Sequence, residues 1–584
     1  MNSKYSIVFF VLLALTLSLA ATPFFNKSNF TYAQSVGDNS KRPNILILAG
    51  DDFGFADIGV FGSEIHTPNL DALASDGKVL DNFHTHPVCA PARATMHTGV
   101  DNHIVGLGTM YEDIATNQVG QPGYETYITD RVVTSAELLR DAGYHTILSG
   151  KWHLSGQTYE NGTLPSDRGF EESFSLLGGR GHHFNSNELV PGSPVLYEQN
   201  GKIVPRPDNT TYSNVLYTDM LIDSIKKFQG DGKPLFMFFS PQVALNPYQA
   251  PQDYTKKYEG VYDVGYDKIR EQRFEKQKEL GFWPADMPLP TRLPEQKSWD
   301  SLNATEKQYA SKVMQVHAAM IDNLDYHIGR IIQYLKDIGE YDNTLVIFTS
   351  DNGSSEPIEL NNIVFTGVSP EETKQYLSKN NNSIENIGNP DSAVNFGTWG
   401  QGQQVSPLSW FKTQEGEGGA RVPFLIRPPP VTELTSGEDN LIKAFAHVQD
   451  IHPTLLDYAG VQQPSTYHGH QVAAPPGKSM RPLIDGNVDK LYGNNETVSQ
   501  EIFNSSAAFM GDWKALKIDP PLSTGQWQLF NLTKDPGENN DISTIHPDIL
   551  KQIRADYDKF AKDVGIVVTN ESSAGELTAK SSAD

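Results

Sequence analysis

The stretch NILILAGDD, residues 44–52, is a short apolar run that ends in two carboxylates. Two further apolar runs, HTILSGK at 145–151 and NTLVIFTS at 343–350, also end next to polar residues, and each follows a stretch with the periodicity of an amphipathic helix. A fourth run, PLFMFFS at 234–240, has a similar helical stretch before it. Repeated alternation of helix and apolar strand is typical of a mostly parallel sheet with helices on both faces. The pattern therefore predicts an α/β fold built on a large, mostly parallel sheet.

Local signals place the helices between these strands. A helix is predicted at 69–76, and a second one follows Thr134 or Ser135, either of which can cap its N-terminus, and stops at Gly143. The longest predicted helix is amphipathic and covers residues 306–338.

The chain has 584 residues, which is more than one ordinary domain requires. The strand–helix pattern predicts a main domain at 43–490, and the different pattern after it predicts a smaller C-terminal α+β subdomain at 491–584, with a small antiparallel sheet and a terminal helix. Two long, polar and weakly patterned stretches, 252–304 and 355–400, are predicted to be insertions that either shape access to a ligand or decorate the surface.

The N-terminus and the composition suggest where the protein works. Residues 1–34 contain a lysine followed by an apolar run, which predicts an export signal or, if it is not cleaved, a membrane anchor. We therefore expect a secreted or extracytoplasmic protein that meets a membrane only if this segment stays attached. The formal net charge of −25 argues against nucleic acid as a partner, because phosphate backbones are bound by clustered Lys and Arg.

Polar side chains follow the apolar strands at the points where the strands end. They include three carboxylates and an amide, namely Asp51, Asp52, Asp351 and Asn352. Ligands in parallel sheets bind beyond the carboxyl ends of the strands, so these oxygens are expected to meet at one edge. Carboxylates gathered in this way repel one another unless a cation lies among them, and oxygen-only ligation favours Ca²⁺ or Mg²⁺ over Zn²⁺.

Basic side chains accompany this oxygen cluster: Arg93, Lys151, His153 and Lys412. A divalent metal surrounded by several cations makes a pocket for a tetrahedral oxyanion. On this reasoning phosphate esters and sulfate esters are both candidate substrates.

The segment CAPAR, residues 89–93, contains the only cysteine of the chain and fits the pattern Cys-x-Pro-x-Arg. This pattern resembles the signature of the type I, formylglycine-dependent sulfatases. Other segments are similar to secreted arylsulfatases and occur in the family order, among them NILILAGDDFGFADIG, HTPNLDALASDG, LSGKWHLSG, DNTLVIFTSDNG and EGGARVPFLIR. The resemblance extends from about residue 43 to past residue 538, and it implies the fold of the alkaline phosphatase superfamily and the hydrolysis of small-molecule sulfate monoesters.

The resemblance also implies a role for each matching residue. Cys89 is expected to be oxidised to Cα-formylglycine by a generating enzyme, and the hydrated aldehyde then supplies a gem-diol nucleophile. The expected Ca²⁺ ligands are Asp51, Asp52, Asp351 and Asn352, and Asp351 is also the expected acceptor of the attacking hydroxyl's proton. The remaining roles are contacts to the gem-diol by Arg93 and His153 and contacts to the sulfate by Lys151 and Lys412.

Leu245 departs from the family pattern. In the segment PQVALNPYQAP the family has a histidine at this position, which contacts the sulfate and can protonate the leaving group. Three explanations are open: a substrate with a good leaving group such as a phenol, replacement by His182 or His183 as substrate-binding residues, or a slow enzyme. Two other functions are also open, a phosphonate or phosphate ester hydrolase of the same superfamily and a catalytically impaired anion-binding homologue.

Overall fold

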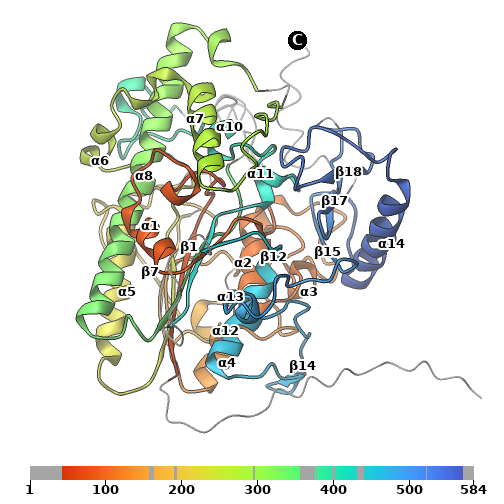
Figure 1. Cartoon of the computed structure of the whole chain (residues 1–584). Helices are drawn as coiled ribbons and strands as arrows, with labels where there is room; N and C mark the ends of the chain where they lie inside the picture. The colour runs from red at the N-terminus through yellow and green to blue at the C-terminus, as the bar shows by residue number, and fades with distance from the viewer. Residues whose placement is uncertain are drawn as a thin grey trace, which may run out of the picture. The chain divides into compact units, whose positions relative to one another are not determined.

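The four predicted strands form the parallel centre of a ten-stranded sheet (Figure 1). They are β9 (Thr344–Ser350), β1 (Asn44–Gly50), β8 (Leu235–Ser240) and β4 (His145–Lys151), which lie side by side in this order. Every residue of these strands is buried, as expected for strands covered on both faces.

The computed structural model describes residues 42–569, apart from 157–158, 160–162, 190–193, 294–295, 356–374, 376–377, 397–400, 430–439 and 521. The predicted export segment at 1–34 and most of the predicted insertion at 355–400 lie outside the described residues. In the part of the chain that is described, no helix has both the length and the apolar character needed to cross a membrane.

The outer strands make the sheet mixed. On one side of the centre follow β10 (Phe424–Arg427), β2 (Lys78–Leu80) and β11 (Leu441–Ile442), and on the other β5 (Glu172–Leu176), β6 (Tyr197–Gln199) and β7 (Lys202–Val204). β10 runs antiparallel to both β9 and β2, and β6 runs antiparallel to both β5 and β7. The prediction of a large, mostly parallel sheet is therefore confirmed, with antiparallel pairs confined to its flanks.

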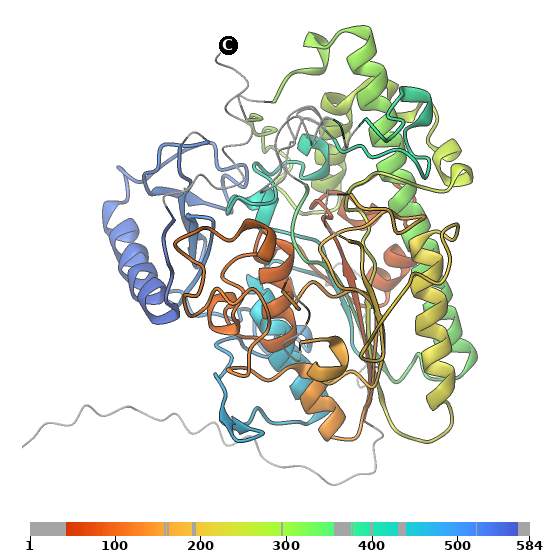
Figure 2. The same cartoon turned by 180° about the vertical axis from the view of Figure 1, so that it is seen from behind.

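Helices cover both faces of the sheet (Figures 1 and 2). One face carries α1 (Pro68–Ser75), α5 (Ser213–Phe228) and α8 (Ala304–Asp337), and the other carries α2 (Cys89–Thr98), α4 (Ser135–Asp141) and α12 (Ile451–Ala459). Side chains alternate along each strand, so Leu46 and Leu48 of β1 join the first core, and Ile45 and Ile47 join the second.

The predicted start of α4 agrees with the structure, whereas α1 and α8 begin one and two residues earlier than predicted. The side chain of Thr134 accepts a hydrogen bond from the backbone of Glu137, whose carboxylate accepts one from the backbone of Thr134. This capping box fixes the start of α4 at Ser135. An equivalent pair, Asn303 and Glu306, starts α8.

The stretch 252–304 is an ordered part of the fold, contrary to the weakly patterned insertion that its sequence indicated. It contains α6 (Gln252–Lys257) and α7 (Tyr266–Glu279). Arg273 of α7 is buried, and its guanidinium pairs with Asp57 at 2.9 Å and with Glu64 at 2.7 Å. α7 is thus held against the segment that follows β1.

The C-terminal region contains a separate antiparallel sheet of four strands, which confirms the smaller α+β unit. The strands are β15 (Thr497–Ile502), β16 (Ser505–Met510), β17 (Trp513–Lys517) and β18 (Gln528–Asn531). α14 (Pro547–Val564) packs on it through Ile553 and Tyr557. The shorter elements are α3 (Asn102–Val105), α10 (Gln401–Gln404), α11 (Glu417–Ala420), α13 (Arg481–Ile484), β3 (Phe83–His84), β12 (Ala446–His447), β13 (Thr466–Tyr467) and β14 (His470–Gln471).

A buried ion network joins this sheet to α11 and to β3. Lys514 of β17 places its Nζ 2.9 Å from Glu417 and 2.8 Å from Glu538, and all three side chains are fully buried. Glu417 also pairs with Nε2 of His84 at 3.1 Å. The network fixes α11, which lies five residues after Lys412, to the C-terminal sheet.

Candidate active site

Three carboxylates from two neighbouring strands meet at the carboxyl edge of the sheet. Asp51 and Asp52 follow β1, and Asp351 follows β9, which pairs with β1 in parallel along its whole length. One ligand atom from each of these residues and the sulfur of Cys89 lie within 4.8 Å of one another, and all four residues are buried. The structure thus brings together the carboxylates that the strand pattern placed at this edge.

Helix α2 delivers Cys89 and Arg93 to the same place. Cys89 is the first residue of α2, and Arg93 lies one turn later, so both side chains are on one face of the helix. The cysteine sulfur is 3.6 Å from Oδ1 of Asp51, and Nε of Arg93 donates to Oδ2 of Asp351 at 2.8 Å. The spacing Cys-x-Pro-x-Arg is therefore a helical spacing, with Pro91 in the first turn, where a missing N–H costs nothing.

Each remaining carboxylate is paired with a lysine. Nζ of Lys151, the last residue of β4, donates to Oδ2 of Asp51 at 2.8 Å. Nζ of Lys412 donates to both carboxylate oxygens of Asp52, at 2.8 and 3.1 Å. With the Arg93 pair, three cations balance three carboxylates, so a bound divalent cation would leave the site with an excess of positive charge.

Burial changes the acidity of these groups. Burial and the neighbouring Asp351 raise the pKa of Asp51 to about 6. Burial also opposes ionisation of Asp351, but Arg93 and Lys151 outweigh it and keep the pKa of Asp351 below its usual value. Burial raises the pKa of the Cys89 thiol to about 12. Since the thiolate is the reactive form of cysteine, the unmodified Cys89 is a poor nucleophile at neutral pH.

Asn352 fits the role of a fourth oxygen ligand. Its side chain is fully buried, and its Nδ2 donates to Oδ1 of Asp52 at 2.6 Å. Its Oδ1 has no hydrogen-bond partner among the residues that the structure describes. A buried acceptor beside three carboxylates is the kind of donor that hard cations such as Ca²⁺ use, so these four residues fit such an ion.

Two site residues have an unusual backbone conformation. Asp52 and His153 both have φ near +62°, in the left-handed region that residues other than glycine rarely occupy. Such strain is found where the surrounding structure fixes a side chain for function.

His153 has a partner that the sequence did not reveal. Its Nε2 lies 3.2 and 3.3 Å from the carboxylate oxygens of Glu112, in the 3₁₀-helix Tyr111–Asp113. Its Nδ1 is buried without a hydrogen-bond partner among the described residues. Nothing in the local sequence marks Glu112, because it lies on an irregular segment far from any strand end.

His182 and His183, the possible replacements for the family histidine, are both buried. Nδ1 of His183 bonds Oγ of Ser213 at 2.8 Å, and its Nε2 bonds the carbonyl of Leu245 at 3.3 Å. Nδ1 of His182 accepts from Nε2 of Gln249 at 2.9 Å. Both ring nitrogens of His183 are therefore engaged in holding the segment around Leu245, which leaves His182 as the better candidate for contact with a substrate.

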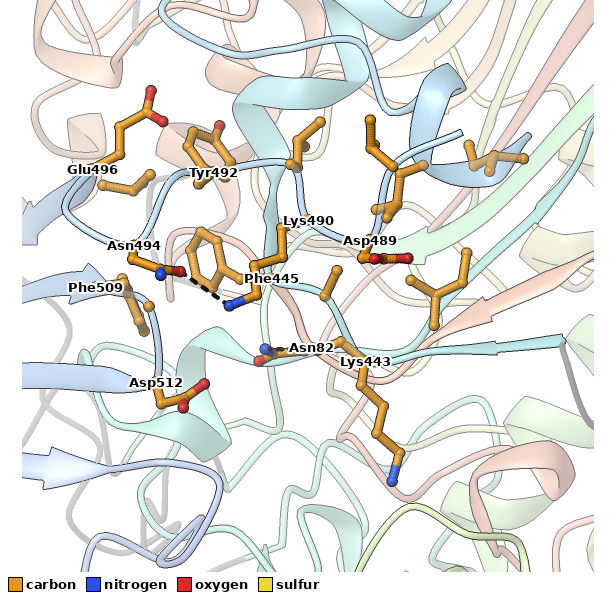
Figure 3. A pocket seen from close by; sticks show the side chains of 18 of the residues that line it. Asn82, Lys443, Phe445, Asp489, Lys490, Tyr492, Asn494, Glu496, Phe509 and Asp512 are labelled. Atoms are coloured by element: carbon orange, nitrogen blue, oxygen red, sulfur yellow. Dashed lines mark hydrogen bonds between the residues drawn. The ribbon is translucent and has the colours of Figure 1, made fainter. Parts of the chain in front are cut away.

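A cavity of about 810 Å³ lies between the C-terminal sheet and the main sheet (Figure 3). Its lining includes Phe445, Tyr492, Lys443, Asp489 and Asp512, and none of the residues of the carboxylate cluster. Because its wall carries both signs of charge, it does not select an anion. The cluster at the strand ends, with its three basic side chains, is the candidate oxyanion site.

Comparison with known proteins agrees with this geometry. The sequence profile of the sulfatase family matches residues 43–461. An uncharacterised sulfatase of Schizosaccharomyces pombe is 38% identical over 553 residues, which cover 92% of this chain and 96% of the relative. An arylsulfatase of Klebsiella aerogenes is 36% identical over 427 residues, which cover 72% of this chain and 87% of the relative. The crystal structure of Ps i-CgsB in complex with k-i-k-neocarrahexaose has a TM-score of 0.61 at 22% identity and covers 92% of this chain and 97% of that chain.

The chain shares its fold, a large and mostly parallel sheet covered by helices, with that solved structure. The chain belongs to the sulfatase family and is a sulfuric ester hydrolase. The predicted family and class of reaction are thus confirmed.

Proposed function

We propose that this sulfatase is an arylsulfatase-type enzyme that uses a formylglycine made from Cys89 and a bound Ca²⁺. One observation carries the proposal. Cys89 begins α2 in a buried position among three carboxylates and three basic side chains, at the edge of the sheet where ligands bind. A buried thiol with a raised pKa has no evident use there, whereas an aldehyde in the same place forms a gem-diol that the surrounding groups can hold.

The gem-diol accounts for turnover. A formylglycine at position 89 would supply two hydroxyls on one carbon. One of them would serve as the nucleophile toward sulfur while the alcohol or phenol leaves with a proton. The other would allow sulfate to be released with return of the carbonyl, which water would hydrate again. A serine or an unmodified cysteine has no second hydroxyl, so its sulfated form would persist.

The chain's own residues supply the binding and the proton transfers. In this proposal Lys151 and Lys412, which bond Asp51 and Asp52, hold the sulfuryl oxygens, and Arg93, one helical turn after Cys89, holds the nucleophile. Asp351, which Arg93 keeps ionised, is placed to accept the proton of the attacking hydroxyl. Ca²⁺ held by Asp51, Asp52, Asp351 and Asn352 would supply fixed positive charge to this site.

The buried Leu245 bears on the choice of substrate. Leucine cannot donate a proton, so esters whose leaving group needs little protonation are favoured. Phenols are such leaving groups, and this is why we propose aryl sulfates rather than alkyl sulfates. We also propose that residues 1–34 export the chain and that a formylglycine-generating enzyme of the host acts on it during maturation.

Two measurements on natively produced protein test the proposal. Mass spectrometry of the peptide that spans residue 89 should show the loss of mass that accompanies conversion of the thiol to the aldehyde. The kcat/KM for 4-nitrophenyl sulfate should exceed the values for the matching phosphate and phosphonate esters, and the variant Cys89→Ala should lose activity. Equal activity with an intact thiol, or a preference for the phosphate or phosphonate ester, would show that the proposal is wrong.

A further inference from the structure

We propose that Glu112 is a positioning residue that holds the imidazole of His153 with its proton on Nε2 and its lone pair on Nδ1. The inference rests on the proposed function, in which His153 contacts the gem-diol. Both carboxylate oxygens of Glu112 lie within hydrogen-bond reach of Nε2, at 3.2 and 3.3 Å. A carboxylate only accepts hydrogen bonds, so Nε2 is the donor and Nδ1 is left as an acceptor.

The surroundings of His153 support this assignment. The side chain is 4% exposed, so water cannot freely take the place of the carboxylate. The ring of Tyr111 packs edge-on against the imidazole at a centroid distance of 6.2 Å. Nδ1 is buried and has no partner within the described ranges. Burial and the charges of Lys151 and Arg93 lower the pKa of His153 against the opposing effect of Glu112, and this favours the neutral ring. A buried acceptor without a partner is expected to receive a hydrogen bond from a ligand.

Gly179 provides a second and independent observation. A Cβ atom at this position would lie 2.9 Å from Cε1 and 3.0 Å from Nε2 of His153, and 3.2 Å from Oε1 of Glu112. The adjacent Gly178 is different, because a Cβ atom there would meet only the hydroxyl of Tyr111, at 3.8 Å. The absence of a side chain at Gly179 therefore leaves room for the hydrogen bond between Glu112 and His153.

This arrangement suits the second half of the reaction. With its lone pair on Nδ1, His153 can accept the proton of the remaining hydroxyl while the carbonyl forms and sulfate leaves. Glu112 stabilises the imidazolium that results, because its carboxylate lies on Nε2. Without Glu112 the ring can turn or change tautomer, and the covalent sulfate ester should break down more slowly.

The chain offers a matched control near the other end of β4. His153 lies two residues after this strand, and His145 is its first residue. Glu171 pairs with Nδ1 of His145 at 2.9 Å, and its side chain is 37% exposed compared with 35% for Glu112. Glu112→Ala should lower kcat by about 10- to 100-fold with little change in KM. Glu112→Gln, whose amide oxygen can still accept from Nε2, should recover part of that loss. Glu171→Ala should leave kcat unchanged.

Pre-steady-state kinetics distinguishes a positioning role from a merely structural one, because a structural defect alone would not produce a burst of product. If release of sulfate is slowed, Glu112→Ala should give a burst of about one equivalent of 4-nitrophenol followed by slow turnover. Gly179→Ala should also give a burst followed by slow turnover, whereas Gly178→Ala should have the kinetics of the unsubstituted enzyme. The melting temperature of each variant reports whether it folds.

The outcomes separate this inference from the proposed function. If the unsubstituted enzyme cleaves 4-nitrophenyl sulfate but Glu112→Ala keeps its kcat within twofold, the positioning role is overturned and the function stands. A loss of kcat without a burst, and without recovery in Glu112→Gln, also overturns it. If the unsubstituted, formylglycine-containing enzyme does not cleave sulfate esters, the proposed function is overturned, and this inference with it.

Discussion

Replacing Lys514 by methionine should destabilise the protein far more than the same change at Lys517. Both lysines are on β17, so the strand and the type of substitution are matched. Lys514 is fully buried between Glu417 and Glu538, whereas Lys517 is 30% exposed and pairs with a partly exposed aspartate. The comparison isolates the effect of burial on an ion pair.

The expected magnitude follows from the partners that remain. Removing one member of a buried ion pair costs about 3–5 kcal/mol, because the other member keeps a buried charge. Glu417 retains His84 at 3.1 Å and an arginine at 3.5 Å, which limits its loss. Burial and the neighbouring Glu417 already raise the pKa of Glu538 to about 7, so Glu538 can take up a proton once Lys514 is gone. We therefore expect a cost near the low end, and less than about 1 kcal/mol for Lys517→Met.

Thermal unfolding measures the difference. For a chain of this length, with about 2.1 cal/mol/K of unfolding entropy per residue, a loss of about 3–5 kcal/mol lowers the melting temperature by about 2–4 °C. The double variant Lys514→Met with Glu538→Gln should recover part of this loss, because it removes the unpaired acid. The reasoning is refuted if the two single variants melt at the same temperature, or if the double variant is no more stable than Lys514→Met.

Three further predictions concern the metal, pH and the leaving group. Ca²⁺ added to chelator-treated protein should raise its thermal stability, because the ion relieves repulsion among the carboxylates. The expected gain is about 2.7 kcal/mol when the free Ca²⁺ concentration is a hundred times the dissociation constant. No rise in stability would argue against a cation site. Burial opposes protonation of His103, but Asp101 and Glu501 outweigh it and raise the pKa of His103 to about 10. In urea unfolding, the protein should therefore be more stable than His103→Gln by its full margin below about pH 6.5, and the margin should be lost as the pH rises toward 10. A margin that does not depend on pH would contradict this. Leu245→His should increase kcat/KM by about a hundredfold for alkyl sulfates and much less for 4-nitrophenyl sulfate, and equal changes for both would show that no proton donor is missing.

The sequence predicts the parallel centre of the fold well because the signals there are local. Each central strand is a short, wholly buried apolar run, and its polar end follows directly in the chain. Once the strands are parallel, Asp51 and Asp351 must share an edge, since β1 and β9 pair in register from Asn44 to Gly50. These carboxylates could be placed together without any knowledge of the side-chain contacts.

The helix α7 and the residue Glu112 could not be predicted, because no regular spacing of apolar residues marks them in the sequence. α7 buries one face at the helical period, but that face includes Arg270, Arg273 and Gln277 as well as apolar residues. A pattern search based on apolar residues therefore misses it. Glu112 could not be predicted for a related reason: what marks it is its contact with His153, which lies 41 residues away in the chain.

In the proposed mechanism, Leu245 and Glu112 act on different steps of the reaction. Leu245 is buried and cannot donate a proton, so on this proposal expulsion of the alcohol depends on the leaving group itself. The pair formed by Glu112 and His153 acts on the step after that, which is the same for every substrate, because the alcohol has already left. On this proposal, the overall rate with good leaving groups is set by the release of sulfate, which Glu112 and His153 assist. The rate with poor leaving groups is set by the chemistry of the ester. This division depends on two side chains and does not require a change in the proposed metal ligands or in the basic residues around Cys89.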